Sequence, residues 1–170
     1  MATNISFKDV VGLANGDVGD QAWLDGSADA LQKAVRDLVE KGGEPAARFK
    51  DLLHGIWLGH PLHPILTDIT IGAYTFSVAA DLLGLRKIAD PLLGLGIVSS
   101  FPTAMSGAAD WSDSESRSRR VGLIHAGLNS VALALFCASL VARGNRARGA
   151  GQALSLLGFG LTNVSAWLGG

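Results

Sequence analysis

Four long apolar runs follow one another along the last two thirds of the chain, and the segments between them are short and charged. Each run is close to the roughly 20 residues that a helix needs to cross about 30 Å of hydrocarbon. A soluble bundle of four buried helices is the alternative, but four successive runs of this length disfavour it. The pattern predicts an all-α integral membrane four-helix bundle in a domain covering residues 59–170, with spans at about 65–85, 91–109, 121–142 and 150–168.

The segment before the runs is polar and changes character at Ser27. Residues 1–26 are predicted to be a flexible tail. Residues 27–58 are predicted to form one or two short amphipathic helices, with Ser27 as the first N-cap and Gly42-Gly43 as the first stop. Two interpretations of this segment remain open: a cover over the end of the bundle, or a helix lying in the membrane interface.

Composition narrows the functional classes. Charged residues make up 17% of the chain, against about 25% in typical soluble domains, and the mean hydropathy is +0.31. The net charge of −1 gives no basic footprint for nucleic acid. Cys137 is the single cysteine, so a thiolate zinc site or a cysteine-ligated iron–sulfur cluster is excluded. No phosphate-binding loop is evident, so neither NAD nor another nucleotide is expected.

Histidines are concentrated at the start of the first apolar run. Three of the four histidines lie between His54 and Pro64, and two of them directly precede prolines. A residue before proline is pushed out of the helical region, so His60 and His63 are predicted to be extended. In a polyproline II segment they would project to one side, about 9 Å apart.

The even number of spans predicts a polar layer at one membrane face. Asp68 and His125 would each lie about one turn inside their spans and face one another or a shared ligand, because an unpartnered ionisable group in a membrane costs at least a few kcal/mol. The functional interpretation is a proton path, an ion or a cofactor, and the structural one is a hydrogen bond that locks the bundle. The supporting polar residues are Asp110, Asn129 and Asn163.

Imidazole ligands suit zinc, copper and haem iron alike. Bis-histidine ligation of b-type haem is geometrically sensible in a four-helix bundle, between His125 and either His60 or His63. A transition metal ion is the other candidate, with His60, His63, Asp68 and His125 as its ligands.

The stretch from Trp57 to Ala73, WLGHPLHPILTDITIGA, resembles the signature of an uncharacterised bacterial four-span membrane family with a GHPLHP motif. The stretches SGAADWSD at Ser106–Asp113 and RVGLIHA from Arg120, and the closing AWLGG, also fit. This resemblance implies the fold and a membrane location but no established activity. Some members are fused to a Rieske-type iron–sulfur domain, which implies a redox setting by association.

Two functions follow as hypotheses. The first is a membrane redox module that binds b-type haem or a metal and works with other membrane or redox subunits, including a Rieske-type partner in trans. The second is a non-catalytic accessory subunit of a larger membrane complex, with a structural His/Asp layer. In both, electron transfer or assembly is expected rather than stand-alone catalysis. The expected location is the bacterial cytoplasmic membrane with both termini outside, since the basic stretch Arg143–Arg148 has no acidic residues.

Overall fold

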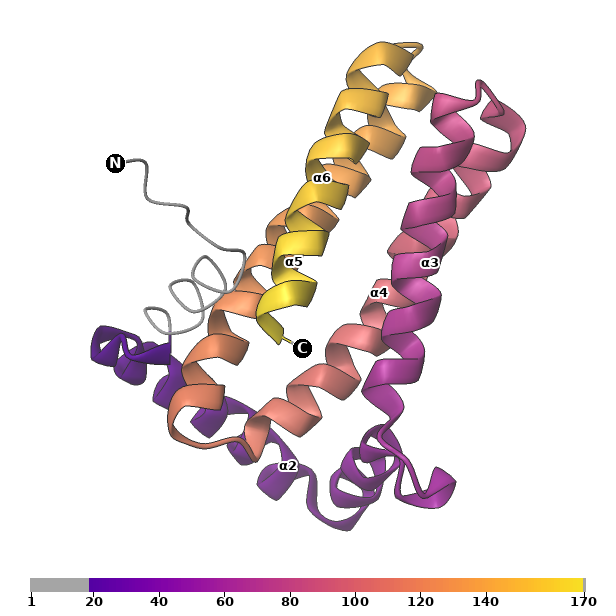
Figure 1. The fold of residues 1–170 in the computed structure, drawn as a ribbon. Helices are drawn as coiled ribbons and strands as arrows, with labels where there is room; N and C mark the ends of the chain where they lie inside the picture. Colours follow the sequence, from indigo (N-terminus) through magenta and orange to yellow (C-terminus); the bar gives the residue numbers. More distant parts are fainter. Residues whose placement is uncertain (1–18, 170) are drawn as a thin grey trace, which may run out of the picture.

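The computed structural model describes residues 19–169, and these residues are helical without any strand. Long helices occupy all four apolar runs, as Figure 1 shows. The all-α prediction is therefore confirmed. In chain order the elements are η1 (Ala22–Leu24), α2 (Asp25–His54), η2 (Ile56–Leu58), α3 (Leu62–Leu82), α4 (Arg86–Ser112), α5 (Ser116–Gly144) and α6 (Arg148–Gly169).

The four long helices form two antiparallel pairs, α3 with α4 and α5 with α6 (Figure 1). Glycines permit the close approach within the second pair. A Cβ on Gly158 of α6 would lie 3.2 Å from the Ala132 carbonyl oxygen of α5. Between the pairs, the rings of Tyr74 and Phe136 stack with their centroids 3.7 Å apart. In lipid the hydrophobic effect does not drive helices together, so close van der Waals packing of this kind holds the two pairs together.

Helix α2 crosses the end of the bundle where α4 and α5 are connected (Figure 1). It begins at Asp25, so the predicted cap at Ser27 is wrong and the residue before the helix is Leu24. The predicted interruption is present as a kink at Gly43, which has φ 60° and ψ −148°. Helix continues to His54. Of the predicted flexible tail, residues 1–18 lie outside the described part, whereas residues 22–24 form η1.

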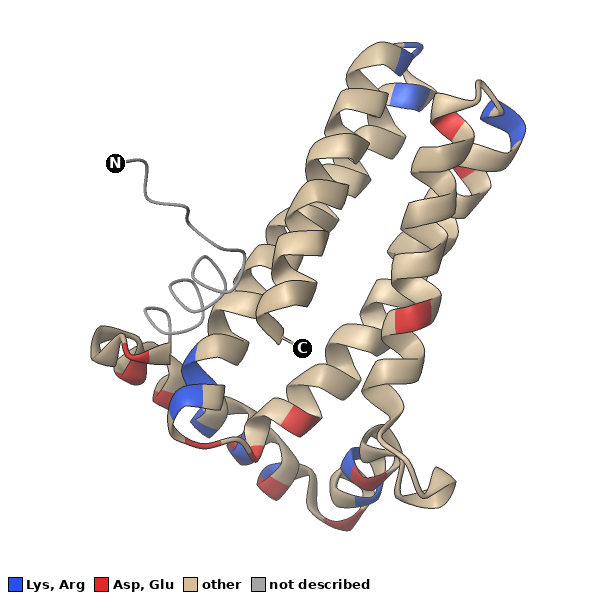
Figure 2. Cartoon of the chain, in the orientation of Figure 1, with Lys and Arg blue, Asp and Glu red and all other residues tan. Residues whose placement is uncertain are grey.

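Charged residues gather at the two ends of the bundle, and the helices between them are almost free of charge (Figure 2). Helices α3, α4 and α5 are each long and apolar enough to cross a membrane. The segments chosen from the sequence at 65–85, 91–109 and 121–142 fall within or overlap these three helices. Helix α6 is of similar length, but its most apolar stretch is less apolar than those of these three helices.

Candidate functional site

His63 stands in the first turn of α3 and reaches across to α4. Its Nδ1 lies 2.9 Å from the Thr103 carbonyl oxygen. A carbonyl only accepts, so Nδ1 carries a proton, and in the neutral ring the lone pair is on Nε2. The only hydrogen-bond partner of Nε2 among the described residues is the Thr67 hydroxyl, at 3.5 Å. His63 therefore presents an available acceptor atom.

The helical conformation of His63 contradicts the predicted extended one. Helix α3 begins at Leu62, and Pro61 before it has φ −53° and ψ 130°. Pro64 then occupies the first turn, where an N–H has no intrahelical partner to lose. Helix α3 thus begins about three residues earlier than the predicted span, and His63 in its first turn contacts Thr103 of α4. The pair of histidines consequently does not project to one side as a polyproline segment would place it.

His125 has a matching arrangement on α5. Its Nδ1 lies 2.7 Å from the Ser165 carbonyl oxygen of α6, which fixes the proton on Nδ1 by the same reasoning. The Asn129 side-chain amide donates to Nε2 over 2.9 Å. Asn129 follows His125 by four residues and so shares its helix face. Asn129, one of the predicted supporting polar residues, therefore contacts His125 directly.

Glycines provide the space for both imidazole rings. A Cβ on Gly107 would lie 2.7 Å from Cε1 of His63, and one on Gly169 would lie 2.5 Å from Nδ1 of His125. Real Cβ atoms do not approach neighbours this closely, so a larger residue at either position forces the ring to move. Neither glycine was among the residues predicted from the sequence to form the site.

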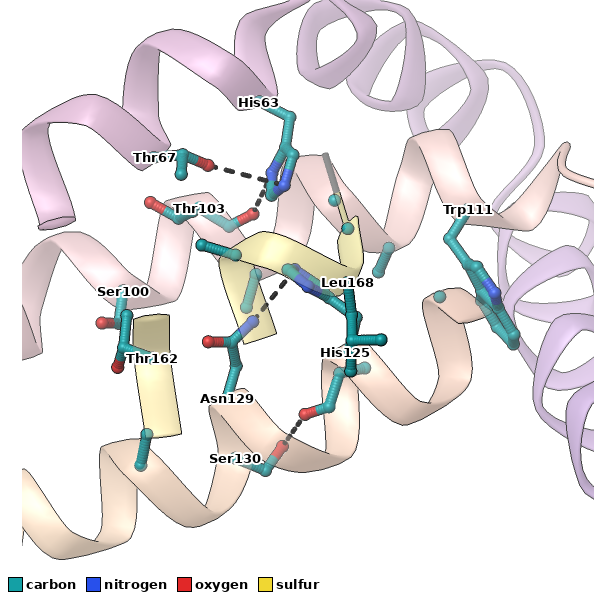
Figure 3. A pocket seen from close by; sticks show the side chains of 18 of the residues that line it. His63, Thr67, Ser100, Thr103, Trp111, His125, Asn129, Ser130, Thr162 and Leu168 are labelled. Carbon is teal, nitrogen blue, oxygen red and sulfur yellow. Dashed lines mark hydrogen bonds between the residues drawn. The ribbon is translucent and has the colours of Figure 1, made fainter. Parts of the chain in front are cut away.

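A cavity of about 780 Å³ separates the two helix pairs, and both histidines line it. In Figure 3, His63 on α3 and His125 on α5 approach the cavity from different pairs. This volume lies within the range of about 300–1,000 Å³ typical of ligand and cofactor pockets. Most of the lining surface is apolar. Besides the two histidines, the polar lining residues include Thr67, Thr70, Tyr74, Ser100, Thr103, Arg117, Ser118, Asn129, Ser130 and Thr162.

Hydroxyl groups bond one another along the α3–α4 wall of the cavity. The Thr70 hydroxyl lies 2.9 Å from the hydroxyls of both Ser99 and Thr103, and the Tyr74 hydroxyl lies 2.8 Å from that of Ser100. These bonds satisfy polar groups that have no water to bind in a membrane interior. Serine and threonine are common in membrane helices, so residue type alone did not distinguish the four serine and threonine positions.

Two of the predicted site residues lie away from the cavity. His60 is exposed in the turn before α3, and its Nδ1 lies 3.0 Å from the carbonyl oxygen of Pro61. Asp68 is exposed on the outer side of α3, and its carboxylate has no hydrogen-bond or ion-pair partner among residues 19–169. The predicted approach of Asp68 to His125 is therefore wrong. The described residues contain no group of three or more His, Cys, Asp or Glu placed to hold a metal ion.

Asp110 belongs to a different cluster, at the contact of α2 with α4. Its carboxylate lies 2.7 Å from Nδ1 of His54, while Nε2 of His54 lies 3.2 Å from the carboxylate of Asp113. Lys50 completes the cluster at 2.7 Å from Asp113. Partial burial acts to raise the pKa of Asp113, but Lys50 and then His54 outweigh it, so the pKa lies below its usual range. Asn163 is exposed, and its amide donates to the Phe159 carbonyl oxygen.

A second polar cluster joins the two pairs at the opposite end of the bundle, and we call its four residues the clasp. Arg143 contacts both Asp81 and Asp90, and Arg148 contacts the same two carboxylates. The side chains of Arg143 and Asp81 are 2% and 7% exposed. Two cations and two anions thus form a closed ring that is buried in part. With four spans, the loop after α3 and the loop after α5 lie at the same end of the bundle. This placement could have indicated the contact from the sequence, but the four residues were not predicted to meet.

A family model described as "Predicted membrane protein (DUF2231)" matches residues 59–170, which include all four long helices and the GHPLHP motif. The chain belongs to this family. The matched region contains both cavity histidines and the clasp, whereas α2 precedes it. No curated protein matches the chain. No solved structure matches it either. DUF2231 membership establishes a membrane protein and leaves its activity to be argued from the site.

Proposed function

We propose that this DUF2231 protein is a redox-associated membrane module that binds b-type haem in the central cavity, with His63 and His125 as the axial ligands. One observation carries the proposal. Both histidines bond a backbone carbonyl through Nδ1, which leaves Nε2 as the lone-pair atom at a shared, mostly apolar cavity of about 780 Å³.

The donor set has the features expected of haem ligands. Histidine binds haem iron through an unprotonated ring nitrogen. A hydrogen bond from the other ring nitrogen to a carbonyl orients the ring and raises the basicity of the ligand. Thr103 and Ser165 supply these carbonyls. Ligation at His125 requires the amide of Asn129 to turn away from Nε2, whereas at His63 only the Thr67 contact at 3.5 Å is displaced.

The same proposal covers the biological setting. Haem supplies one-electron chemistry, and the residues of this chain bind, orient and shield it from water. The partners are then other membrane or redox subunits, and a Rieske-type protein acting in trans is the candidate from the sequence resemblance. The role is electron transfer or support of it, rather than stand-alone catalysis.

Purification in mild detergent from cells replete with haem and iron tests the proposal. We expect a Soret band and a pyridine haemochrome signal of b-type haem, both lost in His63→Ala and in His125→Ala. His60→Ala is the matched control, because His60 is exposed and away from the cavity. A colourless wild-type protein that also fails to bind added haemin contradicts the proposal.

The alternative function is that of a non-catalytic accessory subunit with a structural polar layer. The observation in its favour is that both ring nitrogens of His125 already have partners within the bundle. In this case His125→Ala lowers thermal stability or assembly with a partner complex, and no prosthetic group accompanies the wild type. Recovery of a stable monomer with bound haem counts against it.

For membrane placement we propose four spans in the bacterial cytoplasmic membrane, with both termini outside. Helix α6 is included because its 22 residues extend about 33 Å and it packs along α5 over most of its length. The polar Gln152 near its start faces Asp81 of the clasp, which accounts for part of its lower hydropathy. Reporter fusions after residues 84, 114, 146 and 170 test this topology, and a cytoplasmic signal at residue 170 contradicts it.

A further inference from the structure

Three consecutive apolar side chains protrude from the bundle just before α3. Ile56, Trp57 and Leu58 of η2 are 65%, 64% and 41% exposed, and we call them the apolar knob. Left-handed glycines bound the knob on both sides, Gly55 with φ 75° and Gly59 with φ 68°. A short polar turn would be enough to connect two helices. The connection alone therefore does not explain why these exposed side chains are apolar.

Gly55 fixes the position of the knob. A Cβ at this residue would lie 2.1 Å from the carbonyl oxygen of His60, so the turn closes this tightly only with glycine. The chain consequently leaves α2, loops out through η2 and returns beside its own starting point. The knob is thus held outward by the backbone rather than by packing of its side chains.

The second half of α2 extends the same apolar surface. Phe49 and Leu52 are three residues apart, so they share a helix face, and they are 47% and 48% exposed. The indole N–H of Trp57 donates to the Leu52 carbonyl oxygen over 3.3 Å, which joins the knob to this face. The exposed apolar side chains of α2 and those of η2 are therefore neighbours.

Two charged side chains of this part of α2 point toward the protein, whereas Glu44, Arg48 and Asp51 are exposed. Lys50 and His54 bond the carboxylates of Asp113 and Asp110 at the end of α4. The outer surface of this segment thus carries exposed apolar side chains beside exposed charged ones. The arrangement fits a helix whose outer face meets a bilayer.

The level of the knob is set by α3, which begins at Leu62 and is a candidate span. The knob lies directly before the point where α3 enters the membrane. The outer surface of α3 continues it with exposed Ile65 and Ile69. We propose that Phe49, Leu52 and the knob insert into the boundary between headgroups and acyl chains, so that a lipid surface is the partner of α2. Tryptophan suits this level because its ring enters lipid while its N–H stays bonded.

Site-directed spin labelling in proteoliposomes of phosphatidylglycerol and phosphatidylethanolamine tests this proposal. In a Cys137→Ala background, single cysteines replace Leu52, Ile56 and Trp57 and are labelled with a nitroxide. Arg48→Cys and Glu44→Cys are matched controls, because both residues are highly exposed on α2 and form an ion pair with each other. Power saturation measures access to oxygen, which partitions into lipid, and to a nickel chelate, which stays in water.

We expect the ratio of oxygen to nickel access to be several-fold higher at positions 52, 56 and 57 than at 44 and 48. A ratio at the three test positions equal to that of the controls contradicts the proposal, because the face would then lie in water. Low access to both reagents also contradicts it, and spin–spin broadening would identify a second copy as the cover. The haem status of the sample does not affect the outcome, so this test is independent of the proposed function.

Discussion

Removing Arg143 should destabilise the bundle more than any surface charge would. Its guanidinium contacts Asp81 and Asp90, and its Nε donates to the Ser139 hydroxyl over 3.1 Å. Breaking one side of a buried ion pair costs about 3–5 kcal/mol, because a buried charge loses its partner. Asp81 keeps Arg148 in the Arg143→Met variant. We therefore expect a loss of stability at the lower end of this range, about 3 kcal/mol.

For a chain of this size, 1 kcal/mol corresponds to roughly 2–4 °C in Tm, so R143M should lower the Tm by about 6–12 °C. Tryptophan fluorescence during heating in detergent measures this shift. Lys87→Met is the control, because Lys87 is exposed in the first turn of α4 and has no ion pair among the described residues. The Tm of Arg143→Lys should lie between those of R143M and K87M, since one ammonium cannot bridge two carboxylates as a guanidinium does. A Tm of R143M equal to that of K87M would show that the clasp does not hold the pairs together.

Two further predictions concern the site and α2. Gly107→Ala should push the ring of His63 from its place and cost about 1–3 kcal/mol, whereas Gly94→Ala on the same helix has open space around it and should cost nothing. Imidazole nitrogen NMR and Tm check this, and an unchanged His63 tautomer signal with an unchanged Tm refutes it. Ion pairs with Arg120 and Arg119 lower the pKa of Asp25 from 3.8 to about 2. Because this pKa is lowered on folding, the stabilisation is complete above roughly pH 4 and lost as the pH falls toward 2. Amide exchange of α2, corrected for intrinsic rates, should show this loss in the wild type and not in Asp25→Asn.

The helices were predictable from the sequence because spanning length and apolar composition act locally along the chain. All four runs are helical, and the family match supports the membrane assignment. The kink at Gly43 was also predictable, since a left-handed backbone after a helix favours glycine. Capping was less predictable. The chain starts α2 at Asp25, where the carboxylate pairs with Arg119 and Arg120 from α5, a contact that is distant in sequence.

The site was predictable in part, and the errors share one physical cause. The even number of spans placed His63 and His125 at the same end of the bundle, and both line one cavity. The number of spans does not fix the rotation of a helix about its axis. Asp68 was assigned inward because of its cost in lipid, yet it faces outward while Thr67 and Thr70 line the cavity. Backbone carbonyls as partners of both imidazoles could not be read from residue types at all.

The outward position of Asp68 also bears on assembly. A carboxylate on the outer side of a spanning helix costs at least a few kcal/mol in hydrocarbon unless something covers or neutralises it. The alternative function as an accessory subunit would provide such a cover. Asp68→Leu therefore separates the two candidate functions: it should leave haem binding unchanged in the redox module and alter assembly in the accessory subunit.

The absorption spectrum of the purified protein, before and after titration with haemin, tests the central claim most directly. The account predicts a b-type spectrum with saturable, one-to-one binding in the wild type and in His60→Ala. It predicts loss of that spectrum in His63→Ala and in His125→Ala while both variants remain folded. A wild type that stays colourless through the titration, or a spectrum that survives both cavity substitutions, contradicts the assignment of the two histidines.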